Sequence, residues 1–439
     1  MNTILHSDAV ANLPHQELTA ELATFLEPVT AQLPEKRLQE VSLLAVQGIL
    51  GAKSPLITQI AKTLVRDAQT IRPLARRLYR FVWNERFSHR DLLKGLYGIA
   101  QRQVAEDQPE RLVVAVDPVN FEKPYTEKLE GVSTVMKSTP PGRGKQKRLT
   151  SGYPAITACV VNLPVPVLTY ANWFSYVMDF VSENHEIYRA LRITRALFPE
   201  RSLCFLGDAG LDDRKIFGWM KLVDAEFIIR AQHNRTVEVY NERLDRWEEE
   251  LLDDLVGVVY LPLRMQVTFT HARKVSVVEK HVGWLKIRLP QTQQLLWLLV
   301  AHDPEHDHDL VLLTNIPIHT AQDAQRLYEE WRSRPDIEHT YRFDQEAGLD
   351  VEDVRVQTLE RMRRIFVLVL MAALFVYRIA AVWAKPAVLW LRRLGGKLGL
   401  PTDCDGNYVL LAGIAAVFVT AATLAFVKRH PFPRECTCG

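Results

Sequence analysis

The chain has 439 residues, of which 48% are hydrophobic and 24% are charged, and these are ordinary values for a globular protein of two or three domains. Its net charge of +2 excludes a protein that attracts nucleic acid through its overall charge. Five cysteines at unpaired spacings exclude a disulfide framework, and the N-terminus shows no basic and apolar secretory signal. We therefore expect a protein of a reducing cytoplasm.

The spacing of apolar residues predicts helices over residues 1–105. Two short helices are expected before residue 83, and the second, at 71–82, has arginines largely off its apolar stripe. The segment 53–90 contains nine Lys or Arg residues and only two acidic ones. Such a pair resembles a helix-turn-helix unit, so we expect a helical DNA-binding domain, with a solvated helix as the alternative. The arginines expected to contact DNA are Arg76, Arg77 and Arg80.

Strand and helix patterns alternate after residue 105, which predicts an α/β domain. The apolar run within 111–119 leads to Asp117, and a second apolar run from residue 202 leads to Asp208. A buried strand that ends on an acidic residue delivers a carboxylate to the edge of a sheet. The two aspartates are therefore candidate site residues.

A Pro/Gly-rich loop at 137–150 separates two of the expected strands. Loops of this kind are exposed, and basic side chains on them suit a phosphate backbone. The basic residues expected to bind DNA there are Arg143, Lys145, Lys147 and Arg148.

Residues 256–301 read as successive strands, after an acidic amphipathic stretch at 241–254. An all-β block inside an α/β pattern predicts an inserted antiparallel domain, which we place at 236–304. Histidines and acids at 302–309 are metal-ligand types, but a solvated hairpin loop is the favoured reading.

Two late segments, 365–384 and 408–427, are apolar over lengths that would cross a membrane. Both are rich in Ala and Val, without an aromatic belt or a clear basic flank. We favour buried core helices, and a membrane protein with two C-terminal spans is the alternative. Residues 386–439 are expected to form a helical C-terminal region.

The stretch 328–342 places Glu338 among arginines and aromatic residues. Alone, it is more typical of an exposed helix with ion pairs. Carboxylate oxygens suit divalent cations, and arginine forks suit phosphate oxygens. Together with Asp117 and Asp208, Glu338 completes a set of three acids that would hold two cations for an in-line phosphoryl displacement.

These residues resemble the cut-and-paste DDE transposases of bacterial insertion sequences, in the group marked by a Tyr-x2-Arg-x3-Glu-x6-Lys signature. The match reads Trp331-x2-Arg334-x3-Glu338-x6-Gln345, so Trp331 stands for the tyrosine and Gln345 for the lysine. The resemblance covers roughly residues 50–385, and the two aspartates match the family's first and second acids.

The resemblance implies an RNase H-like catalytic core over 106–235 and 305–385, built as a mixed sheet flanked by helices. It implies that the catalytic residues and the ligands of two Mg²⁺ ions, for which Mn²⁺ would substitute, are Asp117, Asp208 and Glu338. It also implies that the terminal phosphates are held by Arg334, Trp331 and Arg342.

The expected partners are double-stranded DNA, as terminal inverted repeats and as target, and a second copy of the chain, with no membrane. The expected location is the bacterial cytoplasm, in association with the nucleoid. The alternative function is a decayed or domesticated transposase that binds DNA without cutting it. The change from lysine to Gln345 favours this alternative, and the presence of all three acids opposes it.

Overall fold

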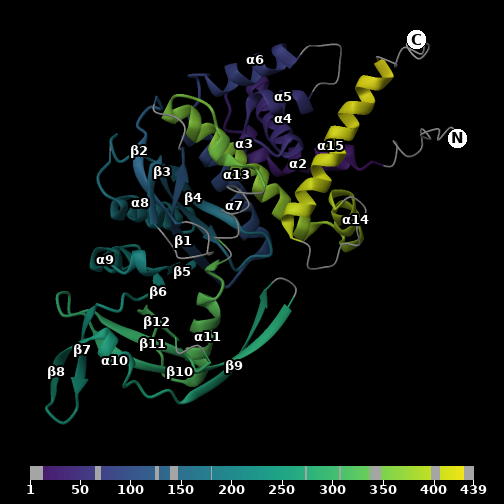
Figure 1. Cartoon of the computed structure of the whole chain (residues 1–439). Coiled ribbons are helices and arrows are strands. Elements are labelled where there is room, and N and C mark those ends of the chain that lie inside the picture. The colour runs from purple at the N-terminus through teal and green to yellow at the C-terminus, as the bar shows by residue number, and fades with distance from the viewer. Residues whose placement is uncertain are drawn as a thin grey trace.

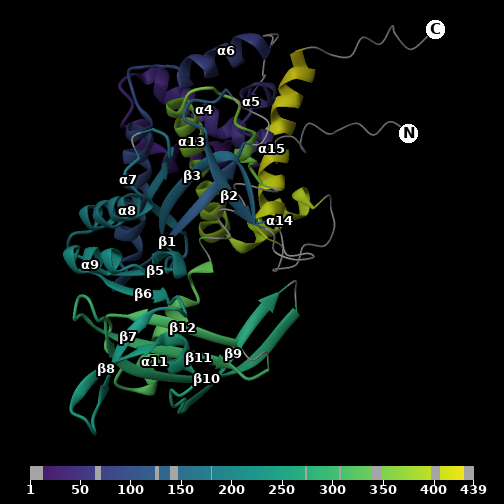
Figure 2. The ribbon, with the colours of Figure 1, turned by 60° about the vertical axis from the view of Figure 1, so that its left-hand side comes forward.

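The computed structural model describes residues 13–64, 71–123, 128–138, 147–178, 180–271, 274–305, 308–335, 337, 348–396 and 406–429. Helices from both ends of the sequence gather at one end of the molecule, and a large mixed sheet extends to the other (Figures 1 and 2). The chain is therefore a mixed α/β protein.

The helices precede, flank and follow the sheet. Their bounds are α2 His15–Phe25, α3 Glu27–Thr30, α4 Lys36–Ala52, α5 Ile57–Thr63, α6 Ile71–Val82, α7 His89–Asp107, α8 Glu183–Leu197, α9 Arg214–Leu222, α10 Leu252–Val256, α11 Ala321–Trp331, α13 Leu359–Val382, α14 Lys385–Gly395 and α15 Asn407–Arg429. Two short 3-10 turns are η1 Ala209–Leu211 and η2 Val351–Asp353.

The strands form one sheet in the order β2-β3-β1-β5-β6-β12-β11-β10-β7-β8, with β4 paired to β3 and β9 paired to β10. Their bounds are β1 Arg111–Glu122, β2 Ser133–Ser138, β3 Lys147–Val160, β4 Val167–Trp173, β5 Ser202–Gly207, β6 Glu226–Arg230, β7 Thr236–Asn241, β8 Arg246–Leu251, β9 Leu263–His271, β10 Lys274–Arg288, β11 Leu295–Asp303 and β12 His308–Thr314. Strand β1 is parallel to β5 and antiparallel to β3, and β5 is parallel to β6.

Strand β1 lies between two layers of helices, and this explains why its first half is continuously apolar. Leu112, Val114 and Val116 belong to the core shared with α8 and α9, whereas Val113 and Ala115 belong to the core shared with α11 and α13. A strand buried on both faces needs apolar residues at every position. The side chain that follows on the α11 face is that of Asp117, because side chains alternate along a strand.

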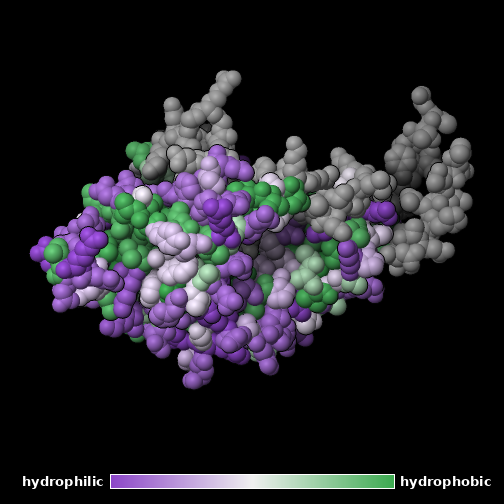
Figure 3. All heavy atoms as spheres, turned by 90° about the horizontal axis from the view of Figure 1, so that it is seen from below, coloured by the Kyte–Doolittle hydropathy of each residue, from purple (hydrophilic) through white to green (hydrophobic). Residues whose placement is uncertain are grey.

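The strands of 236–304 continue the sheet beyond β12, which is antiparallel to β6. Seen from below, this end carries separate apolar patches among hydrophilic side chains (Figure 3). The exposed apolar residues of this region include Val258, Tyr260, Val275, Val277 and Leu295.

Helix α13 is covered by protein over most of its length, and α15 is only partly covered. By length and composition, α13 and residues Asn407–Ala425 of α15 are each able to cross a membrane, and a third span is counted if α4 and α5, which meet at 89°, are taken together. The apolar window of α13 is 72% buried, and that of α15 is 44% buried. The prediction of a buried core helix therefore holds for α13 and only in part for α15.

Candidate active site

Asp117 and Asp208 lie at the same level of two neighbouring parallel strands. The register of β1 and β5 pairs Arg111 with Ser202 and Ala115 with Leu206. Two further residues along both strands bring Asp117 opposite Asp208, the residue that directly follows β5. The two carboxylates, far apart in sequence, therefore meet at one place on the sheet.

Strand β1 does not end at Asp117, as the apolar pattern suggested, but continues to Glu122. The reason is that β3 pairs with β1 along this second half, and it places Thr157 opposite Asp117. The Thr157 hydroxyl is buried, and no hydrogen-bond partner for it lies among the described residues. Nothing in the sequence marked this threonine, because the pairing of strands determines its place.

Arg334 lies between the two aspartates. Its Nη2 atom is 2.8 Å from Oδ1 of Asp117 and 3.9 Å from Oδ2 of Asp208. The side chains of Arg334 and Asp117 are only 12% and 11% exposed, whereas that of Asp208 is 42% exposed. One guanidinium thus offsets the mutual repulsion of two carboxylates at a partly buried position, where charges interact more strongly than in bulk water.

Helix α11 ends at Trp331, three residues before Arg334. It begins with a capping box in which Thr320 and Asp323 exchange hydrogen bonds, as the sequence predicted. The hydrogen bonds from Thr320 hold the pKa of Asp323 below its usual value. Near its end, Glu330 forms an ion pair with Arg111, which also pairs with Glu226. These contacts fasten the end of α11 to the first residues of β1 and β6.

The turn after Asp208 directs one of its carboxylate oxygens. Oδ1 accepts a hydrogen bond of 2.9 Å from the Gly210 backbone N–H, so Asp208 caps η1. The other oxygen, Oδ2, is the one that faces Arg334. The local backbone therefore sets which oxygen is presented to the site.

Several expected site residues lie outside the described part of the chain, namely Glu338, Arg342, Arg143 and Lys145. The backbone of Lys147 starts β3, but its side chain also lies outside that part. Arg148 forms an ion pair of 2.6 Å with Glu122 of β1. Trp331 ends α11 half-buried, and its indole N–H has no hydrogen-bond partner among the described residues.

The basic face of α6 lies at the end of the molecule opposite β8 (Figures 1 and 2). Arg72, Arg76 and Arg80 are exposed there, and the described residues offer them no ion pair, whereas Arg77 pairs with Glu40 at 3.3 Å. The helix buries its opposite side against α4 and α5. Three unpaired guanidinium groups on one face are suited to a polyanion.

Two residues beside this face were not predicted from the sequence. The Arg361 guanidinium of α13 lies over the Trp83 ring, 4.8 Å from its centroid, and Trp83 is 50% exposed. Both residues were visible in the sequence, but a contact between positions so far apart has no local signal.

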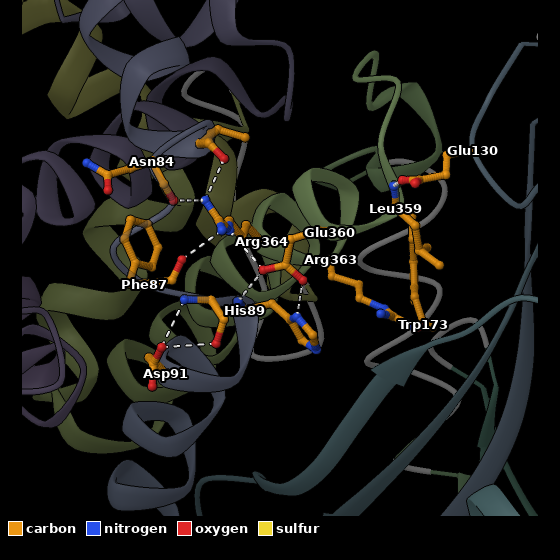
Figure 4. A network of polar contacts seen from close by, with 12 residues as sticks. Asn84, Phe87, His89, Asp91, Glu130, Trp173, Leu359, Glu360, Arg363 and Arg364 are labelled. Carbon is orange, nitrogen blue, oxygen red and sulfur yellow. Dashed lines mark hydrogen bonds and ion pairs between the residues drawn. The ribbon is translucent and has the colours of Figure 1, made fainter. Parts of the chain in front are cut away.

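A polar junction ties α13 to the helices and to the sheet (Figure 4). Arg364 points from α13 to the exit of α6, where it donates hydrogen bonds to the carbonyl oxygens of Val82 at 2.8 Å and Phe87 at 2.7 Å. At the start of α13, the Leu359 N–H donates to Glu130 at 2.8 Å. The junction therefore joins the basic helix region to the sheet that holds the aspartates.

Glu360 completes this junction. Its carboxylate accepts a hydrogen bond of 2.7 Å from the His89 backbone N–H and one of 3.0 Å from Arg364. Burial alone would raise the pKa of Glu360, but the hydrogen bonds and charge of His89, with help from Arg364, outweigh it and lower the pKa to about 2.

Among the described residues, no group of three or more His, Cys, Asp or Glu side chains is arranged to hold a metal ion. The site there supplies two carboxylates, Asp117 and Asp208, and the third expected ligand, Glu338, lies outside the described residues. Carboxylate oxygens are the ligands that hard divalent ions prefer. The carboxylates of Asp117 and Asp208 are therefore of the ligand type that Mg²⁺ binds.

No protein-family model and no curated protein sequence matches the chain. Among solved structures, it is similar to the piggyBac transposase in a synaptic complex with hairpin DNA, with a TM-score of 0.43 and 7% sequence identity. The similarity covers 99% of this chain and 84% of the piggyBac chain. A likeness at this level carries no argument, so the function proposed below rests on the residues and the geometry of the site.

Proposed function

We propose that the chain is a DNA transposase with an RNase H-like catalytic core, which cleaves the ends of a mobile element and joins them to target DNA. One observation carries this proposal: Asp117 and Asp208 meet at the same level of adjacent parallel strands, with Arg334 between them. The mixed sheet, its flanking helices and the strands between β6 and α11 also agree with the architecture that the sequence resemblance implies.

The proposed catalytic acids are Asp117, Asp208 and Glu338. Ile337, which precedes Glu338, is buried, and its N–H donates to the Arg334 carbonyl at 3.2 Å. After the stretch that contains Glu338, the Glu352 carboxylate accepts a hydrogen bond of 2.9 Å from the Glu122 N–H of β1. Arg334, which contacts Asp117 of β1, thus precedes this stretch, and Glu352, which contacts Glu122 of β1, follows it, which supports Glu338 as the third acid.

Mg²⁺ is the proposed cofactor, with two ions held by the three acids and Mn²⁺ able to replace them. When bound, such ions would activate the attacking oxygen and stabilise the leaving oxygen of an in-line phosphoryl displacement. The chain's own contribution is to hold the two carboxylates in register, with that of Asp117 largely shielded from water and that of Asp208 partly open to it. A preorganised site of this kind avoids the cost of gathering like charges when the substrate arrives.

Arg334 is the proposed clamp for a terminal phosphate. Its planar fork matches two phosphate oxygens, and phosphate competes with the carboxylates for the same donors. The Arg334 N–H donates to the carbonyl of Trp331 at 3.0 Å, so Trp331 is proposed to lie at the same phosphate, and Arg342 is proposed as a second phosphate contact. DNA binding would therefore draw the guanidinium from the aspartates toward the substrate.

Double-stranded DNA is the proposed substrate, as terminal inverted repeats and as target. The exposed arginines of α6 and the basic residues around Arg148 are the proposed contacts outside the site. Two copies of the chain are proposed to hold two ends together, in the bacterial cytoplasm. Phosphate contacts of this kind make binding depend strongly on salt.

The test is cleavage of a labelled duplex that carries the inverted repeats flanking the chain's own gene, in the presence of Mg²⁺. The wild type is expected to cut the duplex at the repeat end. Asp208→Asn is expected to bind the duplex with unchanged affinity and to leave it uncut. Asp213→Asn is the matched control, because Asp213 caps α9 outside the site through an interaction that asparagine preserves.

If the wild type and Asp208→Asn both bind and neither cuts, the enzymatic function fails and the DNA-binding alternative replaces it. If Asp208→Asn cuts as well as the wild type, the proposed site itself is wrong.

A further inference from the structure

The turn that carries Asp208 is fastened to the segment that follows β6. The Gln232 side chain donates through Nε2 to the Ala209 carbonyl at 2.9 Å. The Gln232 backbone N–H donates to Oδ2 of Asp212 at 2.7 Å. These two bonds reach the turn on both sides of Gly210, the residue whose N–H holds the Asp208 carboxylate.

Arg235 strengthens this attachment through a buried ion pair. Its Nη2 atom lies 2.6 Å from Oδ1 of Asp212 and 2.8 Å from the Asp212 carbonyl oxygen. The Asp212 side chain is fully buried, and that of Arg235 is 16% exposed. The guanidinium also lies over the Phe217 ring of α9, 5.3 Å from its centroid. Separating the two partners would leave an unpaired charge in the protein interior, which is strongly destabilising. The ion pair is therefore expected to keep one geometry.

The bonds of Gln232 and Arg235 end on the turn and not on the strand. Strand β5 is already held by its pairing with β1 and β6, and Leu211 is buried beneath Gly207. The contacts of Gln232 and Arg235, here called the turn clamp, therefore fix the backbone from Ala209 to Asp212. That backbone orients the Asp208 carboxylate through the Gly210 N–H.

We propose that Gln232 and Arg235 are positioning residues that set the orientation of the Asp208 carboxylate toward Asp117, and thereby the affinity of the site for divalent cations. The inference rests on the proposed function, in which Asp208 is a metal ligand. Neither side chain reaches the candidate site itself: the described contacts of the Gln232 and Arg235 side chains are to the turn and to α9. Partners that orient a metal ligand typically change metal affinity 10- to 100-fold when they are removed.

The chain offers a matched control in Arg195 of α8. Its guanidinium also ties together backbone segments, donating to the carbonyl oxygens of Val223 at 2.7 Å and Arg201 at 2.7 Å. These carbonyls lie on the face of the sheet that α8 and α9 cover, whereas the aspartates face α11. Arg195→Lys therefore removes a comparable clamp without touching the turn of Asp208.

The experiment measures Mn²⁺ binding by calorimetry on the full chain, with and without a duplex of its own inverted repeat. Its variants are the wild type, Asp208→Asn, Gln232→Ala, Arg235→Lys and Arg195→Lys. Duplex affinity and melting temperature are recorded for each. We expect Gln232→Ala and Arg235→Lys to bind Mn²⁺ about 10-fold more weakly than the wild type, with duplex affinity unchanged within about twofold. Arg195→Lys is expected to lose stability and to keep its Mn²⁺ affinity.

The inference is overturned if the two clamp variants lose no more Mn²⁺ affinity than Arg195→Lys at a similar loss of stability. Failure of the proposed function gives a different result. In that case Asp208→Asn binds Mn²⁺ as the wild type does, and the inference falls with it.

Discussion

Replacing Arg364 with methionine tests whether the junction at the start of α13 holds the N-terminal helices to the rest of the chain. Arg364 is buried, and its guanidinium donates to the carbonyl oxygens of Val82, Asn84 and Phe87 and to the Glu360 carboxylate (Figure 4). Methionine fills a similar volume and donates no hydrogen bond. The variant therefore leaves three carbonyl oxygens and one carboxylate without this donor.

The expected cost follows from these contacts. A buried polar group left without its partner costs about 1–3 kcal/mol, and Arg364 serves three carbonyl oxygens together with the half-buried Glu360 carboxylate. These terms overlap, so we expect a loss of about 4 kcal/mol in the free energy of unfolding of the helical end. A loss of this size lowers a melting temperature by roughly 10 °C.

The assay is thermal unfolding followed by calorimetry, with Arg361→Met as the matched control on the same helix. Arg361 makes a surface contact with the Trp83 ring, which is worth about 0.5–1 kcal/mol. If Arg364→Met melts within about 2 °C of Arg361→Met, the buried carbonyl bonds contribute nothing beyond a surface contact, which contradicts the prediction.

Three further predictions concern charge. Arg80→Gln is expected to reduce the slope of log affinity for duplex DNA against log salt by about 1. Arg77→Gln is expected to reduce it less, because Arg77 is paired with Glu40. Equal slopes for the two variants in a salt titration would contradict this. Arg334→Ala leaves two carboxylates facing each other, so Mg²⁺ should raise its melting temperature more than that of the wild type. Because the pKa of Glu360 is lowered to about 2, its stabilising effect is present above about pH 4.5 and is lost as the pH falls toward 2; acid titrations of the wild type and Glu360→Gln should differ in that range, and coincident curves would refute the pairing.

Local patterns in the sequence were enough to find the two aspartates. Asp117 and Asp208 each follow an apolar strand segment, and Thr320 and Asp323 form the capping box of α11. These features depend on neighbouring residues, so periodicity and residue type reveal them. The α/β class followed for the same reason.

Tertiary pairing explains what the sequence did not show. The length of β1 depends on its pairing with β3. Asp117 lies opposite Asp208 because of the register between β1 and β5, two strands that are distant in sequence. Arg364 was out of reach for another reason. Its partners are backbone carbonyls, and residue type says nothing about which carbonyls a buried arginine will meet.

We propose that Asp117 and Asp208 form one metal-dependent site that cuts DNA. The most direct measurement is the yield of 3′-hydroxyl ends released from the chain's own inverted-repeat duplex as Mg²⁺ is titrated. We predict that the wild type releases them in proportion to bound Mg²⁺, and that Asp117→Asn, at equal DNA occupancy, releases none. Release at the wild-type rate by Asp117→Asn would contradict the claim.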